Sequence, residues 1–189
     1  VNVSGRQLEV GDLSADVCDA LDATGLSPDR LVLEITETYA GMVVYSVKTD
    51  LERLRQKGVR IAIDDLGTGF SGLAKIVDLP LDILKIDKQF IAGLPQDSRC
   101  AAITKAILSL GSTLGLDIIA EGIERSDQHE LLIDWGCELG QGFLFGRPVS
   151  GAQMSASFGH GDGYVSRPPP DGSGPSESPA MPGHPVGSA

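Results

Sequence analysis

Hydrophobic and polar positions follow two alternating patterns, short β-rich runs and longer segments with helical apolar spacing. The runs expected to form strands are residues 1–4, 31–36, 59–64, 82–86, 117–121 and about 139–145. The helical patterns include residues 13–23, 44–56, 101–114 and 127–135, and several stop at a glycine, namely Gly25, Gly58, Gly115 and Gly136. About six alternations predict a parallel sheet with helical crossovers, either an open doubly wound sheet or a barrel.

The composition changes after about residue 158. Residues 166–189 hold seven of the eleven prolines, mixed with Gly and Ser. Such a segment has too little apolar surface to offset the entropy lost on ordering. The sequence therefore predicts one domain over residues 1–158 and a disordered Pro/Gly/Ser-rich tail over residues 159–189.

Length and charge narrow the function. With 189 residues and 41% hydrophobic content, the chain can form one globular domain with a sizeable core. A formal net charge of -11 argues against a surface that grips a DNA or RNA polymer, because that mode needs clustered Lys and Arg. Cys18, Cys100 and Cys137 lack disulfide or zinc spacing, which favours a cytoplasmic location, although a longer parent protein could be membrane-anchored.

Each predicted strand has a polar residue at or near its carboxyl end. These residues are Asn2, Glu34, Asp64 with Asp65, Lys85, Glu121 and Gln141. Side chains alternate across a strand, so one face is expected to pack on helices and the other to look into a barrel. In such barrels, polar residues at the carboxyl ends of the strands converge on one cavity.

A single acidic residue at a strand end is more often a helix cap or an ion-pair partner, but six positions in register favour a site. Three or four carboxylates around one cavity repel one another unless cations are present. Carboxylate and amide oxygens suit Mg²⁺ or Mn²⁺. Asp64 and Asp65 could serve two ions roughly 3.5 to 4 Å apart, a geometry typical of phosphoester hydrolysis. The Gly-rich segment 64–71 lacks the ending of a P-loop, and we interpret it as a mobile loop that carries metal ligands.

These residues resemble the EAL domains, bacterial phosphodiesterases that linearise cyclic di-GMP. The matching strings are VNVS at 1–4, LEITET at 33–38, DDLGTG at 64–69, LKID at 84–87, AEGIE at 120–124 and GQGF at 140–143. They occur in family order and at family spacing over residues 1 to about 158. The resemblance implies an incomplete TIM-like (β/α)8 barrel with about six strand-helix units.

The resemblance also implies residue roles and partners. It assigns metal ligation to Asn2, Glu34, Asp64, Asp65, Glu121 and Gln141, with two Mg²⁺ or Mn²⁺ ions. Lys85 would hold the attacking water, Glu121 would be the candidate base, and Glu37 would steady the loop after Asp65. The substrate would be cyclic di-GMP and the product linear pGpG. The family also leaves room for a homodimer and for upstream sensory or GGDEF domains in a longer parent.

One departure from the family pattern is large. The Glu-Ala-Leu triplet is expected roughly sixty residues before Asn2, on a strand of the barrel, and the sequence starts after it. We therefore expect about two strands to be missing. These 189 residues alone are expected to fold poorly, or to expose two sheet edges and associate, and to have weak or no activity. The alternative is a non-catalytic EAL-like module that binds cyclic di-GMP or a protein partner.

Overall fold

The computed structural model describes residues 1–10, 12–40, 45–67 and 78–158. Val1–Arg147 form one compact unit and Pro148–Ala189 a second. Within the second unit, the described element is helix α9 (Gly151–Phe158). The predicted tail, residues 159–189, lies outside the described residues, and the domain boundary at residue 158 stays a prediction.

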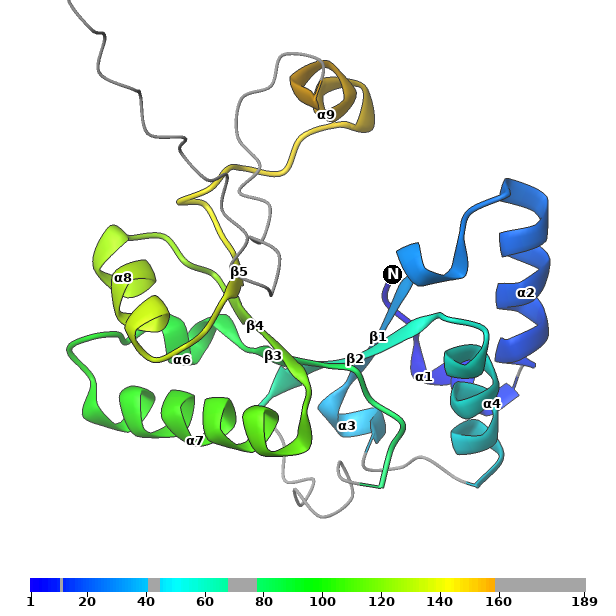
Figure 1. Cartoon of the computed structure of the whole chain (residues 1–189), viewed down its shortest axis with the longest axis horizontal. Coiled ribbons are helices and arrows are strands. Elements are labelled where there is room, and N and C mark those ends of the chain that lie inside the picture. The colour runs from blue at the N-terminus through cyan, green and yellow to red at the C-terminus, as the bar shows by residue number, and fades with distance from the viewer. Residues whose placement is uncertain (11, 41–44, 68–77, 159–189) are drawn as a thin grey trace, which may run out of the picture. The chain divides into compact units, whose positions relative to one another are not determined.

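The first unit is built on a five-stranded parallel sheet in the order β1-β2-β3-β4-β5 (Figure 1). The strands are β1 (Val32–Thr36), β2 (Arg60–Leu66), β3 (Ile83–Ile86), β4 (Asp117–Glu121) and β5 (Leu139–Gln141). Strands consecutive along the chain are neighbours in the sheet, and described helices lie between β1 and β2, between β3 and β4, and between β4 and β5. The predicted α/β fold with a parallel sheet is thus confirmed.

The predicted first strand, residues 1–4, is wrong as an element. Asn2 forms only an isolated parallel bridge with Glu34. The reason is local, because Ser4 and Gln7 cap a helix directly after it: Gln7 Oε1 accepts from Ser4 N at 3.0 Å. Helix α1 (Gly5–Val10) therefore begins before a longer strand can form.

The last predicted strand is also shorter than expected. β5 ends at Gln141, and the chain then turns, with Phe145 N donating to Gly142 O at 3.1 Å. Leu144 N bonds instead to Ile123 O, after β4. Residues 142–145 thus leave the sheet because their backbone groups are satisfied elsewhere.

The first unit contains several helices besides α1. They are α2 (Leu13–Thr24), the 3₁₀ turn η1 (Pro28–Arg30), α3 (Glu37–Ala40), α4 (Tyr45–Gln56), α6 (Lys88–Ala92), α7 (Ser98–Leu114) and α8 (Ser126–Asp134). α7 begins three residues before the predicted start because the Asp97 side chain caps Arg99 N and Cys100 N. Gly25 and Gly115 end α2 and α7 in the left-handed conformation, as their glycine stop signals predict.

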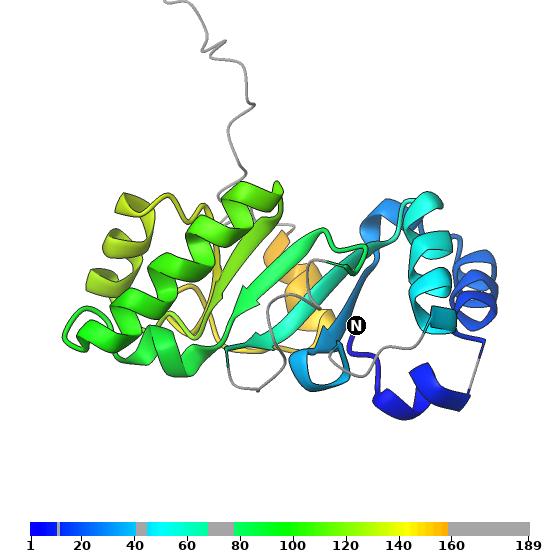
Figure 2. The same ribbon diagram turned by 90° about the horizontal axis from the view of Figure 1, so that it is seen from below.

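The core lies between the sheet and the helices on one face. α4 packs against β2, α2 packs against α4, and α7 packs against β3 and β4 (Figures 1 and 2). Apolar strand positions on this face are almost fully buried: Leu33, Ile35, Ile61, Ile63, Leu84 and Ile86. Apolar helical cover on one face and polar side chains on the other are typical of a barrel wall rather than a doubly wound sheet.

Strands β1 and β5 lie at the two edges of this sheet, and β1 carries the Asn2 bridge at its outer side. All three residues of β5 are exposed. None of the helices in the described ranges combines the length and apolar character needed to cross a membrane.

Candidate functional site

The strand register brings the predicted site residues to one face. Glu34 pairs with Ala62, which lies two residues before Asp64. Ala62 also pairs with Ile83, which lies two residues before Lys85. Paired residues and every second residue along a strand share a face. Glu34, Asp64 and Lys85 therefore lie on the face opposite the apolar core.

The register places Glu121 and Gln141 on this same face of the sheet. Lys85 pairs with Ile119, two residues before Glu121. Glu121 in turn pairs directly with Gln141. The predicted convergence of polar residues from β1 to β5 on one face is what the backbone produces.

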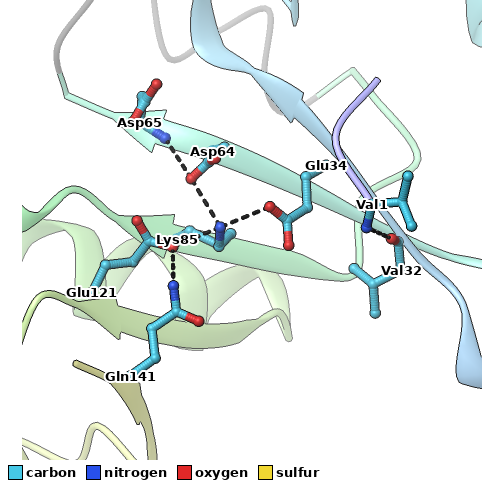
Figure 3. A network of polar contacts seen from close by, with 8 residues as sticks. All are labelled: Val1, Val32, Glu34, Asp64, Asp65, Lys85, Glu121 and Gln141. Atoms are coloured by element: carbon cyan, nitrogen blue, oxygen red, sulfur yellow. Dashed lines mark hydrogen bonds and ion pairs between the residues drawn. The ribbon is translucent and has the colours of Figure 1, made fainter. Parts of the chain in front are cut away.

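Lys85 lies at the centre of a group formed with Glu34, Asp64 and Glu121, which we call the Lys85 cluster (Figure 3). Its Nζ lies 2.6 Å from Glu121 Oε1, 2.9 Å from Glu34 Oε2 and 3.1 Å from Asp64 Oδ1. The Lys85 side chain is only 7% exposed. One ammonium group on β3 thus joins carboxylates from β1, β2 and β4.

The cluster shifts the pKa values of its members. Burial alone would lower the pKa of Lys85, but its hydrogen bonds to Glu121, Glu34 and Asp64 outweigh burial and raise it above the usual range. Lys85 therefore stays charged at neutral pH. Burial also raises the pKa of Glu121; Lys85 opposes this rise, and the charges of Asp64 and Glu34 add to it.

Gln141 supports Glu121 from the neighbouring strand. Its Nε2 donates to Glu121 Oε1 at 2.7 Å. The backbone beyond both strands is also joined, since Ile123 N donates to Gln141 O at 3.1 Å. A Cβ at Gly142 would lie 2.1 Å from Ile123 O, so this close approach requires glycine. These contacts hold the ends of β4 and β5 together beside Glu121.

Asp64 and Asp65 are adjacent but play different parts. Asp64 contacts Lys85, whereas the carboxylate of Asp65 points away from Lys85 (Figure 3). Asp65 has φ 59°, and the register between β2 and β3 shifts between Ile63 and Leu66. Left-handed φ is tolerated by Asp more than by most residues, and such an irregularity re-aims a side chain near a site. Asp65 N donates to Asp64 Oδ1 at 3.1 Å.

Asp87 is a residue that sequence reasoning missed. Burial raises the pKa of Asp65, and the charges of Asp64 and Asp87 together with a hydrogen bond to Asp87 add to the rise. Asp87 also caps α6, accepting from Gln89 N at 2.8 Å. The sequence did contain a signal for Asp87. It lies two residues after Lys85, and side-chain alternation along the strand predicts that both side chains lie on the same face of the sheet.

Asn2 is bridged to Glu34 of the Lys85 cluster, and Glu37 contacts Gly67, three residues after Asp64. The bridge to Glu34 holds Asn2 in register, with Val3 N donating to Glu34 O at 2.9 Å, and Asn2 is exposed. Glu37, 3% exposed at the start of α3, accepts from Gly67 N at 2.8 Å. It thus holds the first turn of the Gly-rich loop, whose residues 68–77 lie outside the described part.

The oxygen atoms of the site residues are of the chemical type that binds hard divalent ions. In the described ranges, no three or more Asp, Glu, His or Cys side chains are arranged to hold a metal ion. The carboxylates instead surround the Lys85 ammonium, which supplies the positive charge that they require. Carboxylate oxygens, with the amide oxygens of Asn2 and Gln141 at hand, are ligands that Mg²⁺ and Mn²⁺ prefer.

Relatives share this sequence over most of its length. The bifunctional diguanylate cyclase/cyclic di-GMP phosphodiesterase MucR of Pseudomonas aeruginosa is 45% identical over 157 residues, which cover 83% of this chain and 23% of MucR. An uncharacterized Mycobacterium tuberculosis protein, Rv1354c, is 40% identical over 154 residues, covering 82% of this chain and 25% of its own. The chain thus spans about a quarter of the length of these curated relatives.

Solved structures share its fold. The PaMucR phosphodiesterase in complex with c-di-GMP superposes with a TM-score of 0.77 at 45% identity, over 82% of this chain and 62% of that one. The EAL domain of Mycobacterium smegmatis DcpA gives 0.81 at 35% identity, over 85% and 72%. A manganese/cyclic di-GMP complex of Klebsiella pneumoniae BlrP1 gives 0.72 at 32% identity, over 78% and 38%.

The family model for the EAL domain matches residues 1–148. This range contains the whole Lys85 cluster and all five strands of the sheet. The chain belongs to the EAL domain family.

Proposed function

We propose that this protein hydrolyses cyclic di-GMP to linear pGpG with the help of divalent metal ions. The observation that carries the proposal is the convergence of Glu34, Asp64 and Glu121, from three strands, on Lys85 of a fourth. A similar protein, MucR, is named a cyclic di-GMP phosphodiesterase and its structure is a c-di-GMP complex. The BlrP1 complexes with cyclic di-GMP contain calcium or manganese.

The metal ligands in this proposal are those expected from the sequence: Asn2, Glu34, Asp64, Asp65, Glu121 and Gln141. Two Mg²⁺ or Mn²⁺ ions bound there would polarise the phosphodiester and lower the pKa of the attacking water. The site chemistry would use oxygen ligands throughout, consistent with hard cations.

The protein side chains then act on water and phosphate. Lys85, charged at neutral pH, would orient the attacking water and offset the negative charge that develops on the phosphate. Glu121, which lies 2.6 Å from the Lys85 ammonium, would accept the water proton. The water oxygen would bond to phosphorus as the bond to the 3′ oxygen breaks. The departing 3′ oxygen would take a proton from solvent, which leaves a 5′-phosphate and a 3′-hydroxyl. Glu37 would act through Gly67, by holding the loop after Asp65.

The test uses the protein as encoded, including any residues upstream of Val1. It is incubated with cyclic di-GMP and Mg²⁺, Mn²⁺ or EDTA, and pGpG is measured by chromatography. We expect metal-dependent pGpG formation that Glu121→Ala or Asp64→Ala abolishes, while Glu130→Ala, an exposed change on α8, leaves it intact. Metal-independent turnover, or full activity in Asp64→Ala, would overturn the proposal. The same assay, applied to residues 1–189 alone, tests the expectation that they have weak or no activity.

A second candidate is a receptor that binds cyclic di-GMP without cleaving it. The observation that favours it is that the described carboxylates are engaged by Lys85 rather than arranged to hold a metal ion. Calorimetric binding of cyclic di-GMP with no pGpG formed at any metal concentration would replace the enzymatic proposal with this one.

A further inference from the structure

The Lys85 ammonium makes short contacts with three carboxylates at once. Its Nζ lies 2.6 Å from Glu121, 2.9 Å from Glu34 and 3.1 Å from Asp64. Each carboxylate comes from a different strand, and all three lie within 3.1 Å of this nitrogen. An ammonium group has three hydrogens, and these three contacts use all of them.

The surroundings make this charge balance important. The side chains are 7% exposed for Lys85 and between 15% and 23% exposed for the three carboxylates. Charges with so little water around them interact more strongly than surface charges. Without the ammonium, three carboxylates would face one another with no cation between them, and their repulsion would favour unfolding or ion uptake.

We propose that Lys85 is an internal counter-cation that competes with divalent ions for the carboxylates of Glu34, Asp64 and Glu121, and so sets the metal affinity of the site. The inference rests on the proposed function for the metal requirement. It gives Lys85 a role that is separate from orienting water, because it acts before substrate binds. A divalent ion gains these oxygens only as Lys85 gives up its contacts.

The two possible roles of Lys85 make different predictions for the metal affinity of the site. If Lys85 only orients water or phosphate, its removal leaves the affinity for a metal ion unchanged. If Lys85 competes for the carboxylates, its removal frees the same oxygens and leaves one more net negative charge. Metal binding must then become tighter, and this can be measured in the absence of substrate and turnover.

The experiment compares wild type with Lys85→Met in the protein as encoded. Methionine is also long and unbranched, so it fills the space of the lysine stem without its charge. Mn²⁺ is titrated in, and free Mn²⁺ is followed by electron paramagnetic resonance. We expect Lys85→Met to bind Mn²⁺ about tenfold more tightly or better. The matched control is Lys88→Met, the same charge change at an exposed position, with an expected change within about twofold.

Thermal melting provides a second measurement. Metal-free Lys85→Met is expected to melt at a lower temperature than wild type, and Mn²⁺ should raise its melting temperature by more. If the variant does not fold without metal, Mn²⁺ should restore its folding, because an ion that binds only the folded state shifts the equilibrium toward it. A variant that stays unfolded at saturating Mn²⁺ would count against the proposal.

The outcomes separate this inference from the function on which it rests. Equal or weaker Mn²⁺ binding by Lys85→Met, with wild-type binding and pGpG formation intact, would overturn the counter-cation role alone. No Mn²⁺ binding by wild type at millimolar concentration would overturn both. Tighter binding by Lys85→Met together with unchanged binding by Lys88→Met would establish it.

Discussion

Gln141 Nε2 donates a 2.7 Å hydrogen bond to Glu121 Oε1. The same oxygen accepts from Lys85 at 2.6 Å, so one carboxylate oxygen is held by two donors from two neighbouring strands. This arrangement orients the residue proposed as the base.

We first predict that Gln141→Leu lowers the rate of cyclic di-GMP hydrolysis by about 10- to 100-fold, because Glu121 loses one of the donors that orient it. Stability should change little, since Gln141 is exposed. Steady-state kinetics checks the rate, with the exposed Gln96→Leu as a control. A fully active Gln141→Leu would show that this hydrogen bond has no part in catalysis.

Glu37 leads to a second prediction. Its buried carboxylate accepts from Gly67 N, so Glu37→Ala leaves that backbone group without its acceptor and should cost about 1–3 kcal/mol of unfolding free energy. Glu37→Gln keeps an acceptor oxygen and should cost less. Urea denaturation monitored by circular dichroism measures both. Equal losses in the two variants would point to the charge of Glu37 rather than its hydrogen bond.

A third prediction concerns pH. Burial is the main cause that raises the pKa of both Asp65 and Glu121, from ordinary values of 3.8 and 4.5. A carboxyl with a raised folded-state pKa stabilises the fold below its unfolded pKa, and this stability is lost as pH rises through the folded pKa. In EDTA, unfolding free energy should therefore fall as pH rises from below 3.8 through the raised values.

The Asp65→Asn/Glu121→Gln double variant provides the comparison for this pH series. Its neutral amides do not titrate, so its stability should fall less over the same pH window. Urea titrations at each pH give the two curves. Parallel curves would mean that neither carboxyl contributes to the pH dependence.

A fourth prediction tests the close approach of the backbone beyond β4 and β5. A Cβ at Gly142 would meet Ile123 O at 2.1 Å, and backbone atoms cannot rotate away. Gly142→Ala should therefore destabilise the protein by about 1–3 kcal/mol, as overpacking does. Gly146→Ala is the control, since a Cβ there would have no described atom within 4 Å. Denaturant midpoints compare them, and equal midpoints would contradict the steric argument.

The fifth prediction is a gain in stability. Thr104 in α7 is fully buried, and its Oγ1 has no hydrogen-bond partner among the described residues. Thr104→Val removes the unsatisfied hydroxyl and should raise the unfolding free energy by about 1 kcal/mol. Thr113 in the same helix donates to Ser109 O, so Thr113→Val should bring no gain. Calorimetric melting temperatures decide, and a lower value for Thr104→Val would contradict the prediction.

Much of the fold follows from local pattern. The alternation in VLEIT and ILKI places apolar residues on one face and Glu34 and Lys85 on the other, as the register confirms. The glycine stop signals at Gly25 and Gly115 end helices as predicted. Strand 1–4 was overpredicted because β-rich residues alone do not reveal that Ser4 and Gln7 cap a helix at once.

The sequence by itself determined the fold class, the family and the set of side chains on the polar face, because strand alternation and motif spacing are local. Only the tertiary structure decided which of them touch. Lys85 joins Glu34, Asp64 and Glu121, while Asp65 turns away toward Asp87. These contacts depend on the register of strands up to dozens of residues apart and on one left-handed φ at Asp65, which no local pattern encodes.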